Sequence, residues 1–498
     1  MSTPEAANGA TSMERATRGV LRDALNVYAD EPDVVVALEH HLGRLDAPLR
    51  VAVAGKMKAG KSTLLNALIG EEIAPTDASE CTRVVTWYEH GPRPRITLHP
   101  SGGPARELPL RRPHGRLALD LGGEPAEQVD RLHIEWPSRS LRAATLIDTP
   151  GIDSLTAGVS SRTTSFLTPD DEPSAADAII YLLRHLHAAD VHFLESFHDT
   201  APGRATMVNA IGVLSRADEI GAGRIDALLS ARAVAARYRQ HPVVRQLCST
   251  VVPVAGLLAQ AGRTLRQSEY LAIEALAGCP RDSTEDLLIS VDRFVRPDAP
   301  VPVDVEQRTA LLDRLGLFGV RLGVTFVRAG MRDASALAAE LARRSGLDEV
   351  RRLLAVQFSE RSALLKSRSA LLGVERVLRD HPRPDGAAVG AEVERIMAGA
   401  HELRELALLA ALRASRVDLS GFGEDANEDA ERLLGATGTS ANQRLGLDAG
   451  APEPEARAAA LDAARVWRTR AASELFDPET IAACQVVVRS CEGLIAEL

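Results

Sequence analysis

A nine-residue loop near the start of the chain has the residue types and spacing that bind a polyphosphate. It runs from Gly55 to Thr63 and follows the pattern Gly-x-x-x-x-Gly-Lys-Ser. In this pattern backbone N–H groups and a helix N-terminus surround anionic oxygens, Lys61 reaches the terminal phosphates, and Ser62 offers a hydroxyl to Mg²⁺. A turn without function is the alternative, but an apolar segment precedes the loop and a helical pattern follows it. We predict that a nucleoside triphosphate binds through Gly55, Lys56, Met57, Lys58, Ala59, Gly60, Lys61, Ser62 and Thr63.

Lysine is scarce in this chain, and its distribution points to the same loop. Of 58 Lys and Arg residues only four are lysine. Lys56, Lys58 and Lys61 lie within six positions of one another, and the fourth is Lys366. The ammonium group is a compact point charge, whereas the guanidinium of Arg is planar and wide. Lysine is therefore used where a small positive charge must fit among phosphate oxygens.

Two further segments have residues that respond to a terminal phosphate and to a metal ion. Asp148 follows an apolar run and begins Asp-Thr-Pro-Gly. Its carboxylate can hold a magnesium-bound water, and Gly151 can offer its N–H to the γ-phosphate. The loop at 74–83 is rich in hydroxyl groups, and Thr82, just before the next strand, is the residue we expect to ligate Mg²⁺. Thr76 is the competing choice.

Residues 215–218 have the composition that selects guanine. They follow an apolar run and their sequence is Ser-Arg-Ala-Asp. The carboxylate of Asp218 can accept hydrogen bonds from guanine N1 and N2, which adenine cannot donate, and the stem of Arg216 can cover the base. The usual motif begins with Asn or Thr followed by Lys, so Ser215 and Arg216 depart from it, and a helix N-cap is the alternative interpretation. We predict a guanine site here that is completed by backbone groups near Ala255.

Strands must bring these segments to one edge of a sheet. Apolar runs predict strands at residues 49–54, 84–88, 95–98, 132–136, 144–147, 178–183, 210–214 and 251–254, with helices between several of them, notably at 190–197 and 224–239. Strands that alternate with helices specify an α/β domain, a mainly parallel sheet covered by helices. The strands near residues 84 and 95 are joined by a short link that contains Gly and Pro, and we expect them to form an antiparallel pair.

The remainder of the chain is expected to be helical. Ala, Leu and Arg dominate beyond about residue 300, which is typical of helix bundles. Helical patterns lie at residues 13–28, 32–45, 264–276, 283–294, 305–328, 333–344, 347–379, 389–414, 428–434, 453–472 and 478–497. We expect three parts: N-terminal helices at 1–46 that pack with a neck, a nucleotide-binding domain with helical additions at 47–355, and a helical neck and trunk at 356–498.

Composition excludes several classes of protein. A net charge of −10 and the lack of a dense basic run argue against a nucleic-acid partner. The five cysteines include no close pair, which favours free thiols in a cytoplasmic location. No run of 18 apolar residues is present, so a membrane span is not expected, although peripheral contact with a membrane stays open.

The order of these motifs resembles that of bacterial dynamin-like GTPases. Residues 58–68, 73–78, 82–87 and 215–226 resemble more particularly the isoniazid-inducible dynamin-like GTPases of mycobacteria, of the shorter IniC type. The resemblance implies an α/β P-loop GTPase domain, an α-helical bundle neck and trunk, and hydrolysis of GTP to GDP with Mg²⁺. It also implies self-association through the GTPase head and membrane remodelling or fission at the inner face of the cell membrane in envelope or drug stress. Whether a second dynamin-like protein takes part is left open.

The residues that assist hydrolysis depart from known GTPase patterns. No Gln follows Gly151 closely, and Met57 and Lys58 stand where eukaryotic dynamins have a Gln-Ser pair. Our hypothesis is that Lys58 supplies positive charge to the transition state, beside Lys61, Thr82 and Gly151. The alternative is that Lys58 merely solvates the rim of the loop.

Two functions are compatible with this sequence. One is the membrane-remodelling GTPase, and the other is a regulatory GTP-dependent switch that acts through a protein partner without touching a bilayer. Lipid contact would need exposed apolar or basic residues at a hairpin end. Candidates are Leu419, Phe422, Arg465, Trp467, Arg468 and Arg470, although ordinary loop and helix-face roles are the more common explanation.

Overall fold

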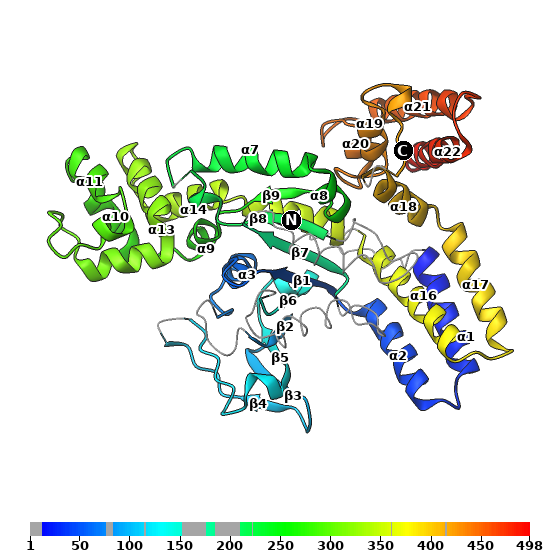
Figure 1. The fold of residues 1–498 in the computed structure, drawn as a ribbon, viewed down its shortest axis with the longest axis horizontal. Helices are drawn as coiled ribbons and strands as arrows, with labels where there is room; N and C mark the ends of the chain where they lie inside the picture. Colours follow the sequence, from blue (N-terminus) through cyan, green and yellow to red (C-terminus); the bar gives the residue numbers. More distant parts are fainter. Residues whose placement is uncertain are drawn as a thin grey trace.

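A mainly parallel nine-stranded sheet lies at the centre of the computed structural model, with helices on both faces (Figure 1). The structure describes residues 12–75, 83–113, 116–151, 176–184, 210–221, 223–359, 361–413 and 416–498. The strand order is β4-β3-β5-β2-β6-β1-β7-β8-β9. The strands are β1 (Leu49–Gly55), β2 (Val85–His90), β3 (Arg95–Pro100), β4 (Arg106–Leu108), β5 (Val129–Trp136), β6 (Ala144–Asp148), β7 (Ala178–Leu183), β8 (Ala210–Leu214) and β9 (Val251–Pro253).

The middle of the sheet is parallel and almost entirely apolar. β1 pairs with β6 on one side and β7 on the other, and β7, β8 and β9 continue in the same direction. Every residue of β7 and β8 is buried, as expected for strands that are covered on both faces. Because the strands are parallel, the segments that follow β1, β6 and β8 emerge at the same edge. The predicted α/β fold class is confirmed.

One predicted pairing is wrong. β2 and β3 do run in opposite directions, but β5 lies between them: it is parallel to β2 and antiparallel to β3. The short link between β2 and β3 suggested a hairpin, yet the strand from residue 129 onward is inserted between them. Strand pairing depends on long-range contacts that a local pattern does not contain. The short strand β4 was not predicted.

Helices cover the two faces of the sheet unequally. α3 (Lys61–Ile69), α9 (Gly256–Thr264) and α15 (Leu347–Leu353) pack on the face that carries Val51 and Val53. α7 (Ala227–Gln240) and α8 (Pro242–Leu247) pack on the face that carries Ala52 and Ala54. We call the sheet with these five helices the head. The predicted helix at 190–197 lies outside the described residues.

Five helices form an extension of the head with its own apolar core, which we call the appendage. They are α10 (Gln267–Ala277), α11 (Arg281–Leu287), α12 (Val291–Phe294), α13 (Val305–Arg328) and α14 (Ala334–Arg344). The helix predicted at 283–294 is two short helices, α11 and α12. The one predicted at 305–328 has its expected bounds but is bent at Gly316.

The first two helices pack against later ones in a bundle that we call the neck bundle. It consists of α1 (Ser12–Val27), α2 (Pro32–Asp46), α16 (Ser362–Asp380) and α17 (Gly386–Gly399), and their apolar stripes form one buried cluster. Lys366 on α16 donates to the carbonyls of Leu45 at 2.8 Å and Ala47 at 3.0 Å. These two carbonyls lie at the end of α2, just before β1. Arg44 donates to both carboxylate oxygens of Asp177, next to β7, at 2.6 and 2.7 Å. Lys366 thus joins α16 to the end of α2, and Arg44 bonds the neck bundle to the head.

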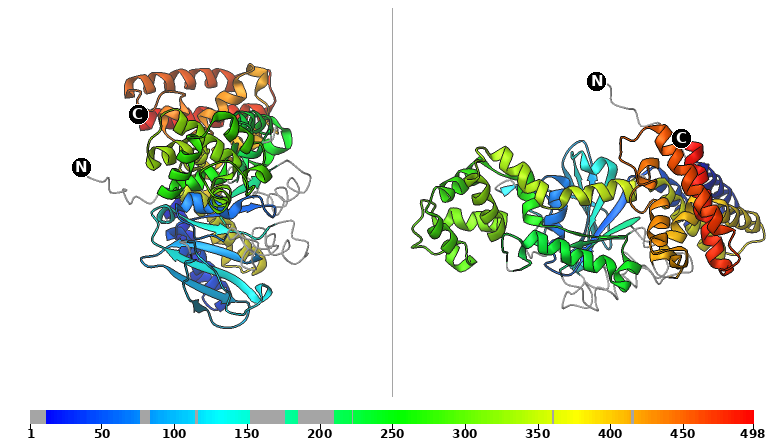
Figure 2. Two further views of the ribbon diagram at one scale, coloured as in Figure 1. Left: turned by 90° about the vertical axis from the view of Figure 1, so that its left-hand side faces the viewer. Right: turned by 90° about the horizontal axis from the view of Figure 1, so that it is seen from above.

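The last helices lie above the neck bundle in the view of Figure 1, and their buried apolar residues continue the core of the head; we call them the C-terminal group. It contains α18 (His401–Arg413), α19 (Ala426–Leu433), α20 (Ala441–Arg444), α21 (Glu453–Ala471) and α22 (Pro478–Glu497). The helix predicted at 389–414 is divided at Ala400 into α17 and α18. Along the longest axis, the appendage, the head and the C-terminal group follow one another (Figure 2).

The helix predicted at 347–379 is interrupted between the head and the neck bundle. A π-helical segment, Leu354–Ser359, separates α15 from α16. Within it the buried side chain of Gln357 accepts a hydrogen bond from Ser249 at 2.6 Å and donates to the carbonyl of Ala436 at 3.4 Å. These contacts to the head and to the C-terminal group explain why the regular helix is broken there.

Two of the candidate lipid-contacting residues are in the core. Leu419 and Trp467 are fully buried, and the indole of Trp467 donates to Asp429 at 3.0 Å. Phe422 packs against Phe476 with ring centroids 4.0 Å apart. In the part of the chain that the structure describes, no helix combines the length and the apolar character needed to cross a bilayer.

Candidate functional site

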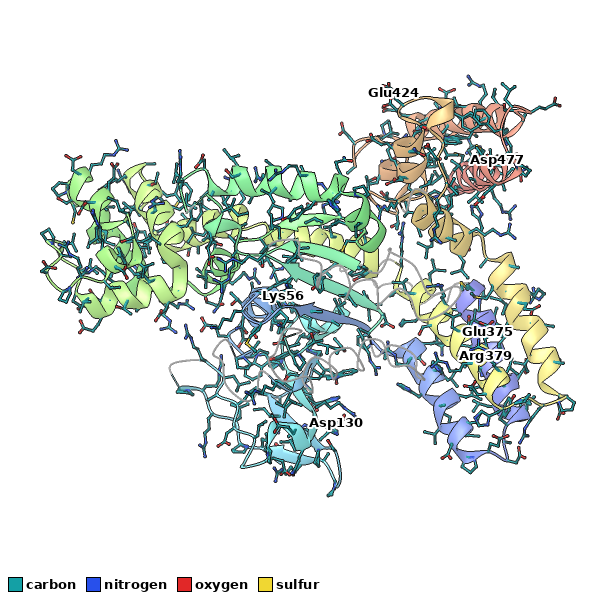
Figure 3. The ribbon with its side chains drawn as sticks, in the orientation of Figure 1. Lys56, Asp130, Glu375, Arg379, Glu424 and Asp477 are labelled. Atoms are coloured by element: carbon teal, nitrogen blue, oxygen red, sulfur yellow. The ribbon has the colours of Figure 1, made fainter. Side chains whose placement is uncertain are left out.

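The phosphate loop lies at the carboxyl end of a central strand. β1 ends at Gly55 and α3 begins at Lys61, so the residues between them form the turn. The N-cap of α3 is Gly60, and no side chain caps this helix end. The N–H groups of the first turn can therefore bind an anion, as the sequence predicts. Figure 3 shows Lys56 in the middle of the head, between the appendage and the neck bundle.

Lys61 lies at the phosphate loop within reach of the charge of Asp148. The Nζ of Lys61 donates to the carbonyls of Gly55 at 3.1 Å and Lys56 at 3.2 Å. Burial lowers the pKa of Lys61, and the charge of Asp148 opposes this effect. The ammonium is thus held at the inner side of the loop, where a terminal phosphate would replace backbone carbonyls as its partner.

The carboxylate of Asp148 is suited to a metal ion. Ser62 Oγ donates to Asp148 Oδ2 at 2.9 Å, whereas Asp148 Oδ1 is buried and has no hydrogen-bond partner among the residues that the structure describes. Burial raises the pKa of Asp148 to about 6, although Lys61 and Ser62 oppose the shift. Mg²⁺ prefers oxygen ligands and needs only one or two carboxylates when phosphates complete its shell. The donor set of Ser62 and Asp148 fits that ion, and the third predicted ligand, Thr82, lies outside the described residues together with Thr76.

Gly151 lies directly against the phosphate loop. A Cβ on Gly151 would be 2.9 Å from both the Cα and the backbone N of Met57, so a side chain there would collide with backbone. Thr149 anchors this segment, because its N–H and hydroxyl both donate to the carbonyl of Val53, at 3.3 and 3.0 Å. The Asp-Thr-Pro-Gly segment and the phosphate loop are thus brought together, as the sequence predicts.

The predicted guanine-binding segment follows β8 and reaches across to the phosphate loop. Arg216 Nη2 donates to the carbonyl of Lys58 at 3.0 Å, and Arg216 Nη1 donates to Glu219 at 2.6 Å. Arg216 and Lys58 are the two residues other than Gly with positive φ among the described residues, at 52° and 60°. Such backbone conformations are uncommon and cluster at functional sites. The Arg in place of the usual Lys thus connects the two loops.

Asp218 is buried at the same place. Its residue is 7% exposed, and burial raises the pKa of its carboxyl to about 6, with a smaller contribution from the charge of Glu219. Ser215 is anchored below it, since its N–H donates to the carbonyl of Leu183 at 2.9 Å. A carboxylate that is shielded from water gains more binding free energy from the N–H donors of a ligand than an exposed carboxylate does. Recognition of guanine requires such a carboxylate.

One cavity joins the phosphate loop to the predicted guanine segment; we call it the candidate cavity. It is lined by Ala59, Gly60, Thr63, Leu64, Leu182, Val213, Ser215, Arg216, Asp218, Glu219, Val254, Gly256 and Leu257.

The loop around Ala255, predicted to complete the base site, lies at the candidate cavity. The N–H of Ala255 donates to the carbonyl of Ser345 at 2.9 Å, and its neighbours Val254 and Gly256 line the cavity. The apolar walls Leu182, Val213 and Leu257 were missed, because apolar residues in a buried strand or helix carry no local signal of ligand contact. The ion pair of Arg184 with Glu219 at 2.6 Å was also missed, because its two residues are 35 positions apart in the sequence.

Comparison with known proteins agrees with this geometry. The model of the Dynamin family matches residues 51–111. The isoniazid-induced protein IniC of Mycobacterium tuberculosis is 45% identical over 96% of this chain and 98% of its own length. A bacterial dynamin-like protein of Nostoc punctiforme is 31% identical over 26% of this chain and 20% of its own. A solved structure is that of an oligomerised bacterial dynamin pair, described as providing a mechanism for the long-range sensing and tethering of membranes. It aligns with 100% of this chain and 76% of its own chain, with 11% sequence identity and a TM-score of 0.37. On the strength of the nearly full-length similarity to IniC, the chain belongs to the IniC family of bacterial dynamin-like GTPases.

Proposed function

We propose that this protein binds GTP with Mg²⁺ and hydrolyses it to GDP and phosphate. The observation that carries the proposal is the candidate cavity, in which the phosphate loop and the buried carboxylate of Asp218 meet. A polyphosphate at Lys61 and a base at Asp218 would use the two ends of one cavity. Membership of a dynamin-like GTPase family supports the same activity.

The phosphate end would hold the metal through Ser62 and Asp148, with Thr82 as a proposed third ligand. When bound, Mg²⁺ supplies positive charge to the phosphate oxygens as the bond to the leaving oxygen breaks. Lys61 would bind the terminal phosphates from the opposite side, and the N–H of Gly151 would place the γ-phosphate. Water attacks the γ-phosphorus, the bond to the β–γ bridging oxygen breaks, and GDP and phosphate leave.

Lys58 is our candidate for stabilising the transition state. It is exposed at the rim of the loop, next to the exposed Met57, and its carbonyl is held by Arg216. An ammonium on this rim can approach the transferring group in the same molecule or in a second copy docked on the head. Family membership supports self-association through the head and action with a second dynamin-like protein as further parts of the proposal.

The neck bundle is suited to transmit the state of the nucleotide. Lys366 and Arg44 bond this bundle to the chain just before β1 and to Asp177 just before β7. Both strands end beside the candidate cavity, so a shift of either strand on hydrolysis would move α2 and α16. We propose that this motion is used in membrane remodelling, on the cytoplasmic face of the cell membrane.

The surface that would touch a bilayer is the turn between α21 and α22. Leu475 in this turn is 90% exposed, the most exposed of the large apolar residues that the structure describes. An apolar side chain at the tip of a helical hairpin can enter the headgroup region of a membrane. The alternative is a regulatory switch that acts through a protein partner. The net charge of −10 and the lack of a dense basic run favour this alternative.

Nucleotide binding is tested by calorimetry of the full chain with GTP, GDP and ATP in Mg²⁺, followed by measurement of phosphate release. We expect micromolar or tighter binding of the guanine nucleotides and slow release of phosphate from GTP alone. Equal binding of ATP and GTP, or no heat with any of them, would contradict the proposal.

Membrane contact is tested by flotation with vesicles of phosphatidylglycerol and phosphatidylcholine, with and without GTP. We expect Leu475→Glu to reduce flotation several-fold, whereas Leu461→Glu, also at an exposed residue of this hairpin, serves as the matched control. If the unaltered protein fails to float in either state, the switch that acts through a protein partner is the better function.

A further inference from the structure

Helix α13 is bent beside the base end of the candidate cavity. In the middle of this helix Gly316 has φ 66° and ψ 168°. This region of backbone space is accessible almost only to Gly, since a Cβ would clash with the chain's own peptide groups. α13 therefore consists of two helical segments that meet at Gly316.

Two arginines hold α13 on either side of the bend. Arg314 donates to Glu269 at 2.8 Å and also to Glu72, and the side chains of all three residues are at most 10% exposed. Arg321 donates to the carbonyl of Gly223, in the loop that follows the guanine segment. Breaking a buried ion pair leaves an uncompensated charge, so these contacts resist any change in the course of the helix. A rare backbone conformation persists where the surroundings fix it in this way.

The bend lies directly behind the carboxylate of Asp218. A Cβ on Gly316 would be 3.8 Å from Asp218 Oδ2 and 3.3 Å from Leu257 Cδ1. Leu257 and Asp218 both line the cavity. The Asp218 side chain is therefore enclosed by the backbone of α13 on one side and faces the cavity on the other.

We propose that Gly316 is a specificity-determining positioning residue: the bent α13 orients the Asp218 carboxylate so that both of its oxygens face the base. This inference rests on the proposed function, because it concerns the same guanine site. A side chain at residue 316 would force the backbone out of its present conformation, and the wall behind the carboxylate would move with it. One of the two hydrogen bonds to guanine N1 and N2 would then be lost.

The experiment compares the affinities of GDP and IDP for the full-length Gly316→Ala protein by fluorescence competition. Inosine lacks the N2 amino group, so IDP can make only one of the two hydrogen bonds. We expect the unaltered protein to prefer GDP by about tenfold, since one hydrogen bond to a charged group contributes roughly 1.5 kcal/mol. In Gly316→Ala the preference should fall to less than about threefold, mainly through weaker GDP binding.

A second glycine of the same region gives the matched control. Gly330 follows the end of α13, has a φ of 103°, and has no other atom within 4 Å of a Cβ placed on it. Gly330→Ala introduces comparable backbone strain far from the base, so its GDP preference should match that of the unaltered protein. If Gly316→Ala does not fold, Arg321→Met, which removes the bond to Gly223, should also lower the preference.

The results separate this inference from the proposed function. The role of α13 is overturned if the ratio of GDP to IDP affinity is unchanged in Gly316→Ala and in Arg321→Met. It is also overturned if the affinities for GDP and IDP fall equally. If the unaltered protein does not prefer GDP over ADP, the proposed function itself fails. If it prefers GDP over ADP and the α13 variants keep their ratio, only the inference about α13 is lost.

Discussion

The phosphate loop and the base end of the candidate cavity each have a carboxylate beside them whose pKa is raised to about 6 by burial, but the two carboxylates differ in what compensates for burial. At the phosphate end, Asp148 has Ser62 as a donor and Lys61 as a counter-charge. At the base end, Asp218 faces apolar walls and the bend of α13. The phosphate end is therefore organised around charge, and the base end around shape and desolvation.

This difference separates affinity from selectivity. Any nucleoside triphosphate can satisfy Lys61 and a metal ion at the phosphate end, whereas only a base with adjacent N–H donors can satisfy Asp218. We expect changes at the phosphate end to weaken all nucleotides alike and changes at the base end to alter their ranking. The following predictions test this division, from the largest expected effect to the smallest.

Lys61→Ala should have the largest effect. Removing the ammonium leaves phosphate oxygens without their charged partner, so GTP and GDP should bind at least about 100-fold more weakly, which is roughly 3 kcal/mol. Calorimetry with both nucleotides measures the loss. Lys56→Ala, five positions before the start of α3 in the same loop, is the control and should weaken binding much less. Equal losses of nucleotide affinity in the two variants would contradict the role of Lys61 in binding the terminal phosphates.

Asp218→Asn should change the ranking of the bases. An amide cannot accept both hydrogen bonds from guanine, so GDP should bind about 30-fold more weakly, on the order of 2 kcal/mol, while binding of XDP improves. Competition against a fluorescent nucleotide gives both affinities. A uniform loss for GDP, XDP and ADP would mean that Asp218 supports the loop and does not contact the base.

Lys58→Ala should affect the rate more than affinity. If its ammonium stabilises the transition state, turnover of GTP should fall about tenfold or more, with GDP affinity changed less than about threefold. Phosphate release at saturating GTP measures this effect, and Lys58→Arg should restore part of it. Turnover equal to that of the unaltered protein would leave Lys58 as a solvated residue of the loop rim.

The last prediction concerns stability, as a shift of a few degrees in melting temperature, and has the opposite sign. Without ligand, the pKa of Asp218 is about 6 in the folded protein and near 3.8 when unfolded, so the folded state binds the proton more tightly. Its contribution to stability is complete below pH 3.8 and is lost as pH rises through 6, up to about 3 kcal/mol. Ligand-free Asp218→Asn should therefore melt a few degrees higher than the unaltered protein at pH 7.5, and at nearly the same temperature at pH 4. A lower melting temperature for Asp218→Asn at pH 7.5 would contradict the raised pKa.

The same division explains what could be predicted from sequence. The phosphate end is built from two short motifs, Gly55 to Thr63 and the segment at Asp148, and each follows a strand of the predicted parallel sheet, so the sequence predicts that they meet. At the base end only Asp218 and its neighbours have a local pattern. The bend at Gly316 interrupts a helical pattern that is continuous in sequence, and the apolar walls come from separate strands and helices.

Errors in the predicted fold have a common cause. The insertion of β5 between β2 and β3, the π-helical segment at Leu354–Ser359 and the division of α17 from α18 all depend on contacts distant in sequence. Gln357, for example, bonds to residues that are over 70 positions away on either side. Strands with uniform burial, such as β7 and β8, were predicted closely because their own composition determines their place in the sheet.

The distribution of lysine makes the protein well suited to covalent footprinting. Acylating reagents that attack amines meet only four lysine side chains, of which Lys56, Lys58 and Lys61 surround the phosphate loop. Lys366 is the remaining one, and it holds the carbonyls at the end of α2. Peptide mass spectrometry after brief acylation would thus report ligand protection at the loop and loosening of the neck in one digest, without any engineered label.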